Sequence, residues 1–99
     1  MKRFQLSVDA ARDIREIWSY IAKDNIKAAR RVRLRICDAC QRIAELPGIG
    51  HRREDLTDKP VLFWRVDSYL IVYSANRRPI EIVRVLHGAL DVPAVLTGM

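Results

Sequence analysis

Two arginines and one histidine in the C-terminal half of the sequence could do chemistry. Arg65 and Arg84 lie within runs of branched and aromatic residues, where a charged side chain is uncommon. A guanidinium on a strand can clamp a phosphate with its planar fork, lie at a sheet edge, or pair with an acid such as Glu81. His87 ends the last of these runs, where it could transfer protons or serve only as a structural hydrogen-bonding group.

No self-contained catalytic set accompanies these residues. Ser68 and Ser74 lack the spacing of a nucleophile with its base, and the sequence has no glycine-rich phosphate loop. Cys37 and Cys40 form a CxxC motif, which can be a redox pair or half of a zinc site. The motif falls in a strongly helical stretch without a second ligand pair. We therefore interpret both thiols as packed on a helix in a reducing compartment, and we predict no metal and no cofactor.

The charge of the chain favours a macromolecular partner over a metabolite. The formal net charge is +6 at pH 7, and the densest basic segment, residues 27–35, contains no acid. Such a segment attracts nucleic acid, an acidic protein segment or a ribosomal surface. A basic run is also a common solvated helix face, and that alternative stays open.

Length and hydropathy limit how the chain is organised. With 99 residues the sequence is expected to form one domain over residues 1–99, because two halves would be too small to bury a core. No apolar run approaches the roughly 20 residues of a membrane helix, and no apolar block with a cleavage site follows the first residues. We expect a cytoplasmic protein without membrane contact.

The N-terminal half predicts one strand and two helices. Residues 4–8 are short and partly alternating, as in a strand, and Ser7 is a suitable cap for a helix that ends near residues 24–25. Apolar residues recur at helical spacing in this helix and in a second one over residues 26–45, which a proline–glycine segment stops. The very short connection predicts an antiparallel helix hairpin.

The C-terminal half predicts an antiparallel meander. Residues 61–66, 69–75 and 80–86 are rich in branched and aromatic residues and are separated by turn signals. Residues 51–60 are polar and predict a loop, with or without a short strand at its start. Residues 91–96 form a short tail, either a strand or a helical turn. The predicted fold class is therefore α+β, with an N-terminal strand, a helix hairpin, a three-stranded meander and a short C-terminal tail.

The turn lengths predict a register for the meander. A two-residue first turn pairs Val66 with Tyr69, and a four-residue second turn pairs Leu70 with Val85. One face of the sheet then carries Arg65, Ser74, Glu81 and His87 together with Phe63, Leu70, Val72, Val83 and Val85. The other face carries Trp64, Ile71, Tyr73, Ile82, Arg84 and Leu86. A slip of one residue would exchange these faces.

Four motifs span nearly the whole chain in a specific order. They are Asp13-Ile14-x-x-Ile17-Trp18-x-Tyr20-Ile21-Ala22, Pro47-Gly48-x-Gly50-x-x-Arg53-x-Asp55-Leu56, Arg65-Val66-x-x-Tyr69-x-Ile71-x-Tyr73 and Ile82-Val83-Arg84-Val85-Leu86-His87-Gly88. Together with the order of the predicted elements, these motifs make the sequence resemble the RelE/ParE toxin superfamily of bacterial type II toxin–antitoxin systems. The first motif and the end of the last one are more similar to the ParE branch.

The resemblance implies a target but leaves two mechanisms open. ParE-like members poison DNA gyrase without catalysis, which favours a non-enzymatic gyrase inhibitor whose target-binding candidates are Arg65, Arg84, His87 and Asp91. RelE-like members cleave mRNA in the ribosome, and for that alternative the catalytic candidates are Arg65, His87 and Arg53. The lysine pair of RelE-like enzymes is replaced here by Arg52 and Arg53, and arginine is a poor general base. The basic residue that ParE-like chains commonly carry before the aspartate is Leu90 here.

The resemblance also implies a partner. A small, acidic antitoxin of the ribbon-helix-helix type is expected to fold onto apolar and basic surface of the helix hairpin and a sheet edge. The candidate residues for this contact are Trp18, Ile21, Arg30, Arg31, Arg33 and Arg35. Operator DNA would be bound only through the antitoxin complex. A non-catalytic nucleic-acid-binding module is a third hypothesis, which explains the basic helix but not the strand motifs.

Overall fold

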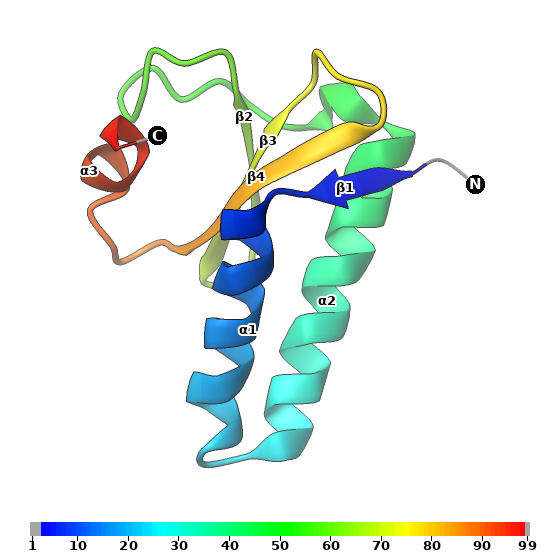
Figure 1. The fold of residues 1–99 in the computed structure, drawn as a ribbon, viewed down its shortest axis with the longest axis vertical. Coiled ribbons are helices and arrows are strands. Elements are labelled where there is room, and N and C mark those ends of the chain that lie inside the picture. Colours follow the sequence, from blue (N-terminus) through cyan, green and yellow to red (C-terminus); the bar gives the residue numbers. More distant parts are fainter. Residues whose placement is uncertain (1–2, 99) are drawn as a thin grey trace.

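The computed structural model describes residues 3–98 as a sheet with two long helices on one face and a short helix on the other (Figure 1). In chain order the elements are β1 (Phe4–Leu6), α1 (Val8–Ala22), α2 (Ile26–Glu45), the 3₁₀ turn η1 (Pro47–Ile49), β2 (Leu62–Val66), β3 (Tyr69–Ser74), β4 (Ile80–His87) and α3 (Val92–Thr97). The predicted order of strand, helix hairpin, meander and tail is confirmed, and the tail is helical.

The strands form one sheet in the order β1-β4-β3-β2. β2, β3 and β4 are antiparallel neighbours, as predicted, whereas β1 pairs in parallel with β4. At the free edge of β2, His51 exchanges two main-chain hydrogen bonds of 2.9 Å with Phe63, so the loop after η1 does begin with an isolated strand pairing. This bridge holds the start of the loop against the sheet edge.

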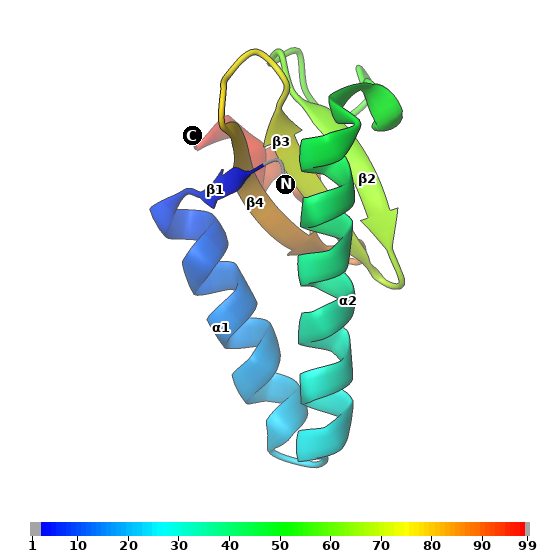
Figure 2. The same ribbon diagram turned by 90° about the vertical axis from the view of Figure 1, so that its right-hand side faces the viewer.

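Two side-chain caps define the helix hairpin, in which α1 and α2 lie side by side (Figure 2). The Ser7 hydroxyl accepts a hydrogen bond from the Ala10 N–H at 2.9 Å, as its predicted cap role requires. The Asn25 side chain caps α2 in the same way through the Ala28 N–H, and its own backbone is extended. Because Asn25 must be extended, α1 ends at Ala22, slightly earlier than predicted. Within residues 3–98 no helix is long and apolar enough to cross a membrane.

The sheet has a separate apolar core on each face. Between the sheet and the long helices the buried residues are Ala10, Ile36, Ala39, Cys40, Ile43, Val66, Ile71, Tyr73, Ile80, Ile82 and Val85. On the opposite face they are Val61, Phe63, Val72, Leu86, Val92 and Leu96. The second core is smaller, and α3 supplies its last two members.

A tyrosine fastens the end of α2 to the sheet. The buried hydroxyl of Tyr73 donates to the Pro47 carbonyl at 2.6 Å and accepts from the Gly50 N–H at 2.9 Å. A Cβ atom at position 50 would lie 2.5 Å from that hydroxyl, so the close approach requires glycine. The clasp fixes where the chain leaves α2 and therefore where the loop toward β2 starts.

The predicted register is right at the first turn, and it is right beside the second turn, where Ser74 pairs with Glu81 and Tyr73 with Ile82, but it fails beyond that point. Val66 pairs with Tyr69, but Leu70 pairs with Leu86 instead of Val85, because β4 has an irregularity opposite Val72 and Tyr73. As a result Val85 faces the long helices and Leu86 faces α3, the reverse of the prediction. The other apolar assignments that the two cores test are confirmed.

Contacts from the N-terminal half hold this irregularity in place. The Ser7 N–H donates to the Ile82 carbonyl at 2.9 Å, and its hydroxyl donates to the Val83 carbonyl at 2.7 Å. The buried carboxylate of Asp13 accepts the Val85 N–H at 2.9 Å. The bulge therefore depends on partners about 70 residues away in the sequence. A register predicted from turn lengths alone cannot take such partners into account.

Candidate target-binding pocket

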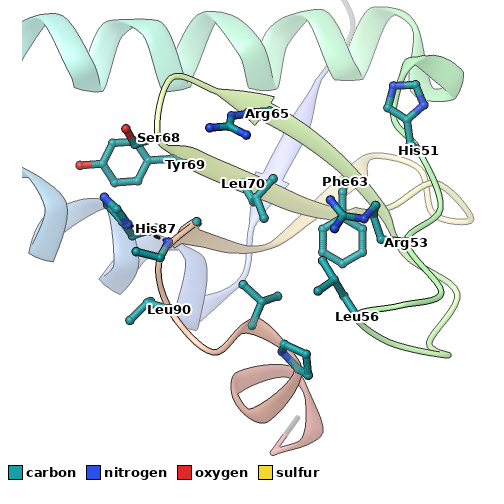
Figure 3. A pocket seen from close by; sticks show the side chains of 14 residues that line it. His51, Arg53, Leu56, Phe63, Arg65, Ser68, Tyr69, Leu70, His87 and Leu90 are labelled. Carbon is teal, nitrogen blue, oxygen red and sulfur yellow. Dashed lines mark hydrogen bonds between the residues drawn. The ribbon is translucent and has the colours of Figure 1, made fainter.

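A pocket of about 430 Å³ opens on the sheet face opposite the long helices (Figure 3). Its walls are the loop that starts at His51, the ends of β2 and β3, and the connection from β4 to α3. The polar side chains of the lining are two arginines, two histidines, a serine and a tyrosine, and none of the lining residues is acidic. They are His51, Arg53, Arg65, Ser68, Tyr69 and His87, with apolar residues such as Leu56, Leu70 and Leu90 between them.

Arg65 is exposed on the edge strand β2 and is held by the turn that follows. Its Nε donates to the Asp67 carbonyl at 3.0 Å. Asp67 has a φ of 54°, the left-handed conformation that a tight turn needs, and its carboxylate forms a bidentate ion pair of 2.8 and 2.9 Å with Arg35 of α2. The turn thus links the basic helix to the pocket arginine.

Arg53 lies in the same pocket but its charge is partly offset. Its guanidinium forms two hydrogen bonds, 3.0 and 2.8 Å, with the carboxylate of Asp55. The hydrogen bond from Arg53 lowers the pKa of Asp55, so this carboxylate stays ionised at neutral pH. Arg53 is therefore a weaker cation toward the pocket than Arg65.

His87 sits at the end of β4 and is oriented by two neighbours. Its Nδ1 accepts the Ala89 N–H at 3.0 Å, and its ring meets the ring of Tyr69 edge-on at 5.4 Å. Since Nδ1 is an acceptor, the proton of the neutral ring is on Nε2, which makes the free nitrogen a donor. Burial, reinforced by Tyr20 and Asp67, raises the pKa of Tyr69 and keeps its hydroxyl protonated.

His51 is the pocket residue that the sequence did not single out. His51 follows the proline–glycine segment that ends α2, in a polar stretch without periodicity. The short strand considered at the start of this stretch is the sequence signal that agrees with its bridge to Phe63. Its ring stacks with Trp64, with centroids 6.3 Å apart. Figure 3 shows His51 and His87 at opposite ends of the pocket, with Arg65 between them.

Arg84, another target-binding candidate, has a structural partner. Its guanidinium forms a bidentate pair with Asp13 of α1 at 2.8 and 2.9 Å, and the two side chains are only 16% and 9% exposed. This carboxylate raises the pKa of Arg84 above its ordinary value. The pair joins α1 to β4, which makes Arg84 a poor source of free charge for a target.

Asp91 lies outside the pocket lining and begins α3. Its carboxylate accepts the Ala94 N–H at 3.3 Å, as a helix cap does. Asp91 therefore caps α3, and its role in target binding stays a prediction.

The residues proposed for antitoxin contact lie on the helix hairpin. Arg33 stacks over the half-buried ring of Trp18 at 4.9 Å, and Arg35 is paired with Asp67. Arg30 and Arg31 are exposed on α2, and Ile21 is half-buried at the end of α1. The structure therefore places apolar and basic groups side by side on this hairpin, and their role in binding stays a prediction.

The two cysteines differ in exposure. Cys40 is buried and Cys37 is exposed, and both are free thiols. Burial raises the pKa of Cys40 to about 12. Among residues 3–98 no group of three potential metal ligands lies together.

Comparison with known proteins identifies the family. The model of the ParE toxin of type II toxin–antitoxin systems (parDE) matches residues 4–92. The curated protein "Putative toxin Y4kP" of Sinorhizobium fredii (strain NBRC 101917 / NGR234) is 34% identical over 95 residues, covering 96% of this chain and 97% of that protein.

A solved structure has the same fold. The structure titled "Chromosomal ParDE TA system from P. aeruginosa" superposes with a TM-score of 0.71 over 88% of this chain and 96% of the other, at 16% identity. At that identity the likeness shows the fold alone, while the family match extends over almost the whole chain. The chain belongs to the ParE toxin family of type II toxin–antitoxin systems.

Proposed function

We propose that this toxin inhibits DNA gyrase by binding, without catalysis, and that an antitoxin neutralises it. The observation that carries the proposal is that the residues predicted for RNA cleavage, Arg53, Arg65 and His87, include no free general base. Arginine does not deprotonate, so Arg53 and Arg65 cannot act as bases. The Nδ1 of His87 already accepts a main-chain N–H, which leaves this ring as a donor.

The second histidine is poorly placed to complete such a pair. His51 pairs with Phe63 on the free edge of β2, whereas His87 pairs with Tyr69 at the other end of the β2–β3 hairpin. Ladder spacings put the two Cα atoms on the order of 15 Å apart. The ring of His51 is also directed to Trp64. General acid–base catalysis needs both groups within hydrogen-bonding reach of one reacting centre, so binding is the better supported mechanism.

Purified gyrase provides the direct test. We expect the toxin to block supercoiling of relaxed plasmid, or to trap cleaved DNA, in a concentration-dependent way. Arg65→Gln should weaken this effect, and Arg15→Gln on the exposed surface of α1 is the matched control with the same loss of charge. Unchanged supercoiling at high toxin concentration would rule out gyrase as the target.

Ribosome-dependent mRNA cleavage is the second candidate, because the structure gathers its three predicted residues, Arg53, Arg65 and His87, in one pocket. His87→Gln separates the two mechanisms, since glutamine keeps an N–H donor but has no titratable nitrogen. A translating extract supplied with the toxin shows the difference. Cuts in translated mRNA that disappear with His87→Gln would establish the enzyme, and intact mRNA beside inhibited gyrase would exclude it.

The antitoxin is proposed to cover the hairpin surface around Trp18 and the α2 arginines. An acidic amphipathic segment could place apolar groups against Trp18 and carboxylates on Arg30 and Arg31. Co-purification with the product of the adjacent reading frame tests this contact. The double variant Arg30→Glu, Arg31→Glu should lose the complex, while Arg65→Gln should keep it, and a complex that survives the double variant would place the antitoxin elsewhere.

A further inference from the structure

The two-residue turn between β2 and β3, Asp67-Ser68, contacts α2, the pocket arginine and the chain that follows β4. We propose that Arg35 of α2 is a positioning residue for target binding, because its ion pair with Asp67 holds this turn and the turn orients Arg65. Arg35 itself lies outside the lining of the pocket. The inference rests on the proposed function only where inhibition of the target is measured.

The anchor of the turn is a bidentate contact. The Arg35 guanidinium donates through Nε and one terminal amino group to the two carboxylate oxygens of Asp67, at 2.8 and 2.9 Å. Two parallel hydrogen bonds fix the direction of a carboxylate as well as its distance. The paired residues are 32 positions apart in the sequence, so the contact ties the turn to the helix hairpin.

The backbone of Asp67 needs such an anchor. Its φ of 54° lies in the left-handed region, and among residues 3–98 no other residue apart from glycine has a positive φ. Aspartate and asparagine tolerate this conformation better than most residues, but glycine adopts it more readily. A carboxylate held at both oxygens restricts the turn to one conformation. The carbonyl groups of the turn then keep fixed directions.

The two carbonyl groups of the turn serve two walls of the pocket. The Asp67 carbonyl accepts the Arg65 Nε–H at 3.0 Å, and the Ser68 carbonyl accepts the Gly88 N–H at 2.8 Å. Gly88 directly follows His87, so the second bond fixes the chain at the end of β4. A rotation of the turn would therefore turn Arg65 away and shift the chain beside His87.

A purely stabilising role is the alternative for this ion pair. The side chains of Arg35 and Asp67 are 58% and 42% exposed, and ion pairs at such positions change an equilibrium by less than about fivefold. The pair therefore contributes little to folding. It does fix the residue whose carbonyl orients Arg65, so its loss should change the direction of that side chain more than the stability of the protein.

The side-chain proton of Arg65 reports its own orientation. In NMR spectra of the free toxin, exchange of the Arg65 Nε proton with water is slowed by the bond to the Asp67 carbonyl. Arg35→Gln should raise this exchange rate about threefold, within the range of an exposed ion pair. Asp67→Asn should do the same, since asparagine tolerates the left-handed backbone but lacks the charge.

A matched control separates positioning from a general effect of charge. Arg15→Gln removes the same charge from the exposed surface of α1 and should leave the exchange rate of the Arg65 proton unchanged. An unchanged rate in both Arg35→Gln and Asp67→Asn would overturn the proposal, whatever the target of the toxin is. Because two variants break the same contact, misfolding of one, seen by circular dichroism, leaves the other as the test.

Inhibition of supercoiling gives the second readout. Arg35→Gln should weaken inhibition about threefold, and most of this loss should disappear in the Arg65→Gln background, where the positioned side chain is gone. Arg35→Lys keeps the charge without the planar fork and should restore inhibition only in part. Additive losses in the double variant, or full restoration by lysine, would mean that Arg35 acts through its charge alone.

The two readouts also separate this inference from the proposed function. A raised exchange rate in a toxin that has no effect on gyrase would retain the positioning role and remove gyrase as the target. The same set of variants would then be compared by the growth arrest that expression of the toxin causes, which presupposes no target. Supercoiling inhibition with an unchanged exchange rate would retain gyrase and remove the positioning role.

Discussion

The two faces of the sheet use charge in opposite ways. On the helix-covered face, Asp13 and Arg84 form a bidentate pair that is mostly hidden from solvent, and Asp13 also accepts a main-chain N–H. On the open face, Arg65 and His87 each make one oriented hydrogen bond and remain exposed around a pocket. Arginines on two strands of one sheet therefore have different tasks, since Arg84 on β4 stabilises the fold and Arg65 on β2 is exposed at the pocket.

The contrast shows that an arginine on a strand is not informative by itself. Arg65 and Arg84 have similar sequence surroundings, but only Arg84 meets a carboxylate from the helix hairpin. What separates them is the partner that the tertiary fold supplies. Substitutions on the two faces should accordingly affect different properties, stability on the covered face and binding on the open one.

The largest effect is expected from breaking the hidden ion pair. Asp13→Ala leaves the Arg84 charge without its partner and the Val85 N–H without its acceptor, which should lower the free energy of unfolding by about 3 kcal/mol or more. Urea denaturation measures the change. Asp9→Ala is the control, since its exposed pair with Arg12 should contribute less than about 1 kcal/mol. Equal effects of both variants would contradict the contrast between the faces.

The two cores should also differ in their response to cavities. Ile36→Ala, under the long helices, should cost about 4 kcal/mol because its surroundings are held on all sides. Leu96→Ala on α3 should cost about 2 kcal/mol, because a short terminal helix can shift to fill part of the space. Urea midpoints compare the two variants. A larger loss of unfolding free energy for Leu96→Ala would show that the core under α3 is packed more rigidly than the core under the long helices.

On the open face, a substitution should change target binding and leave the free energy of unfolding nearly unchanged. Arg65→Gln is expected to reduce gyrase inhibition about tenfold while changing the free energy of unfolding by less than about 0.5 kcal/mol. The reason is that its one hydrogen bond, to the Asp67 carbonyl, lies at the surface. Titration in the supercoiling assay, with urea denaturation of the same sample, separates the two quantities. A stability loss as large as that of Asp13→Ala would assign Arg65 to the scaffold.

The smallest effect concerns the thiols of α2. At about pH 8 a thiol reagent should label Cys37 and leave Cys40 unmodified in the folded protein, as mass spectrometry would show. Burial raises the pKa of Cys40 from 9.0 to about 12. The folded state therefore holds this proton more tightly than the unfolded chain, and stability should fall as the pH rises above about 9. Equal labelling of both thiols would mean that the covered core opens readily.

Local patterns in the sequence predicted the elements well. The bounds of α2 follow from an apolar stripe that ends at a proline, and the first turn of the meander follows from its two-residue length. Both features depend on residues that are close in the sequence, so local patterns are enough to predict them. The family resemblance, which rested on motifs along the entire chain, agrees with the family match over residues 4–92.

Features that depend on distant partners were missed. The bulge in β4 is held by Ser7 and Asp13, and its effect was to exchange the faces of Val85 and Leu86. Asp13 entered the sequence analysis only as part of a motif, whereas in the structure it is the partner of Arg84. His51 reaches the pocket through a bridge to Phe63, and although a short strand at this point was considered, its partner strand was not predicted. Arg65 and His87 do meet at the pocket, but not through the predicted register.

Asp67 connects the helix hairpin to the pocket. Its carboxylate binds Arg35 on the helix expected to meet the antitoxin, and its carbonyl holds Arg65 at the pocket. An incoming acidic side chain that captured Arg35 would compete with Asp67 for the same guanidinium and would untether the turn. Capture of Arg35 by another carboxylate would therefore release the residue whose carbonyl orients Arg65.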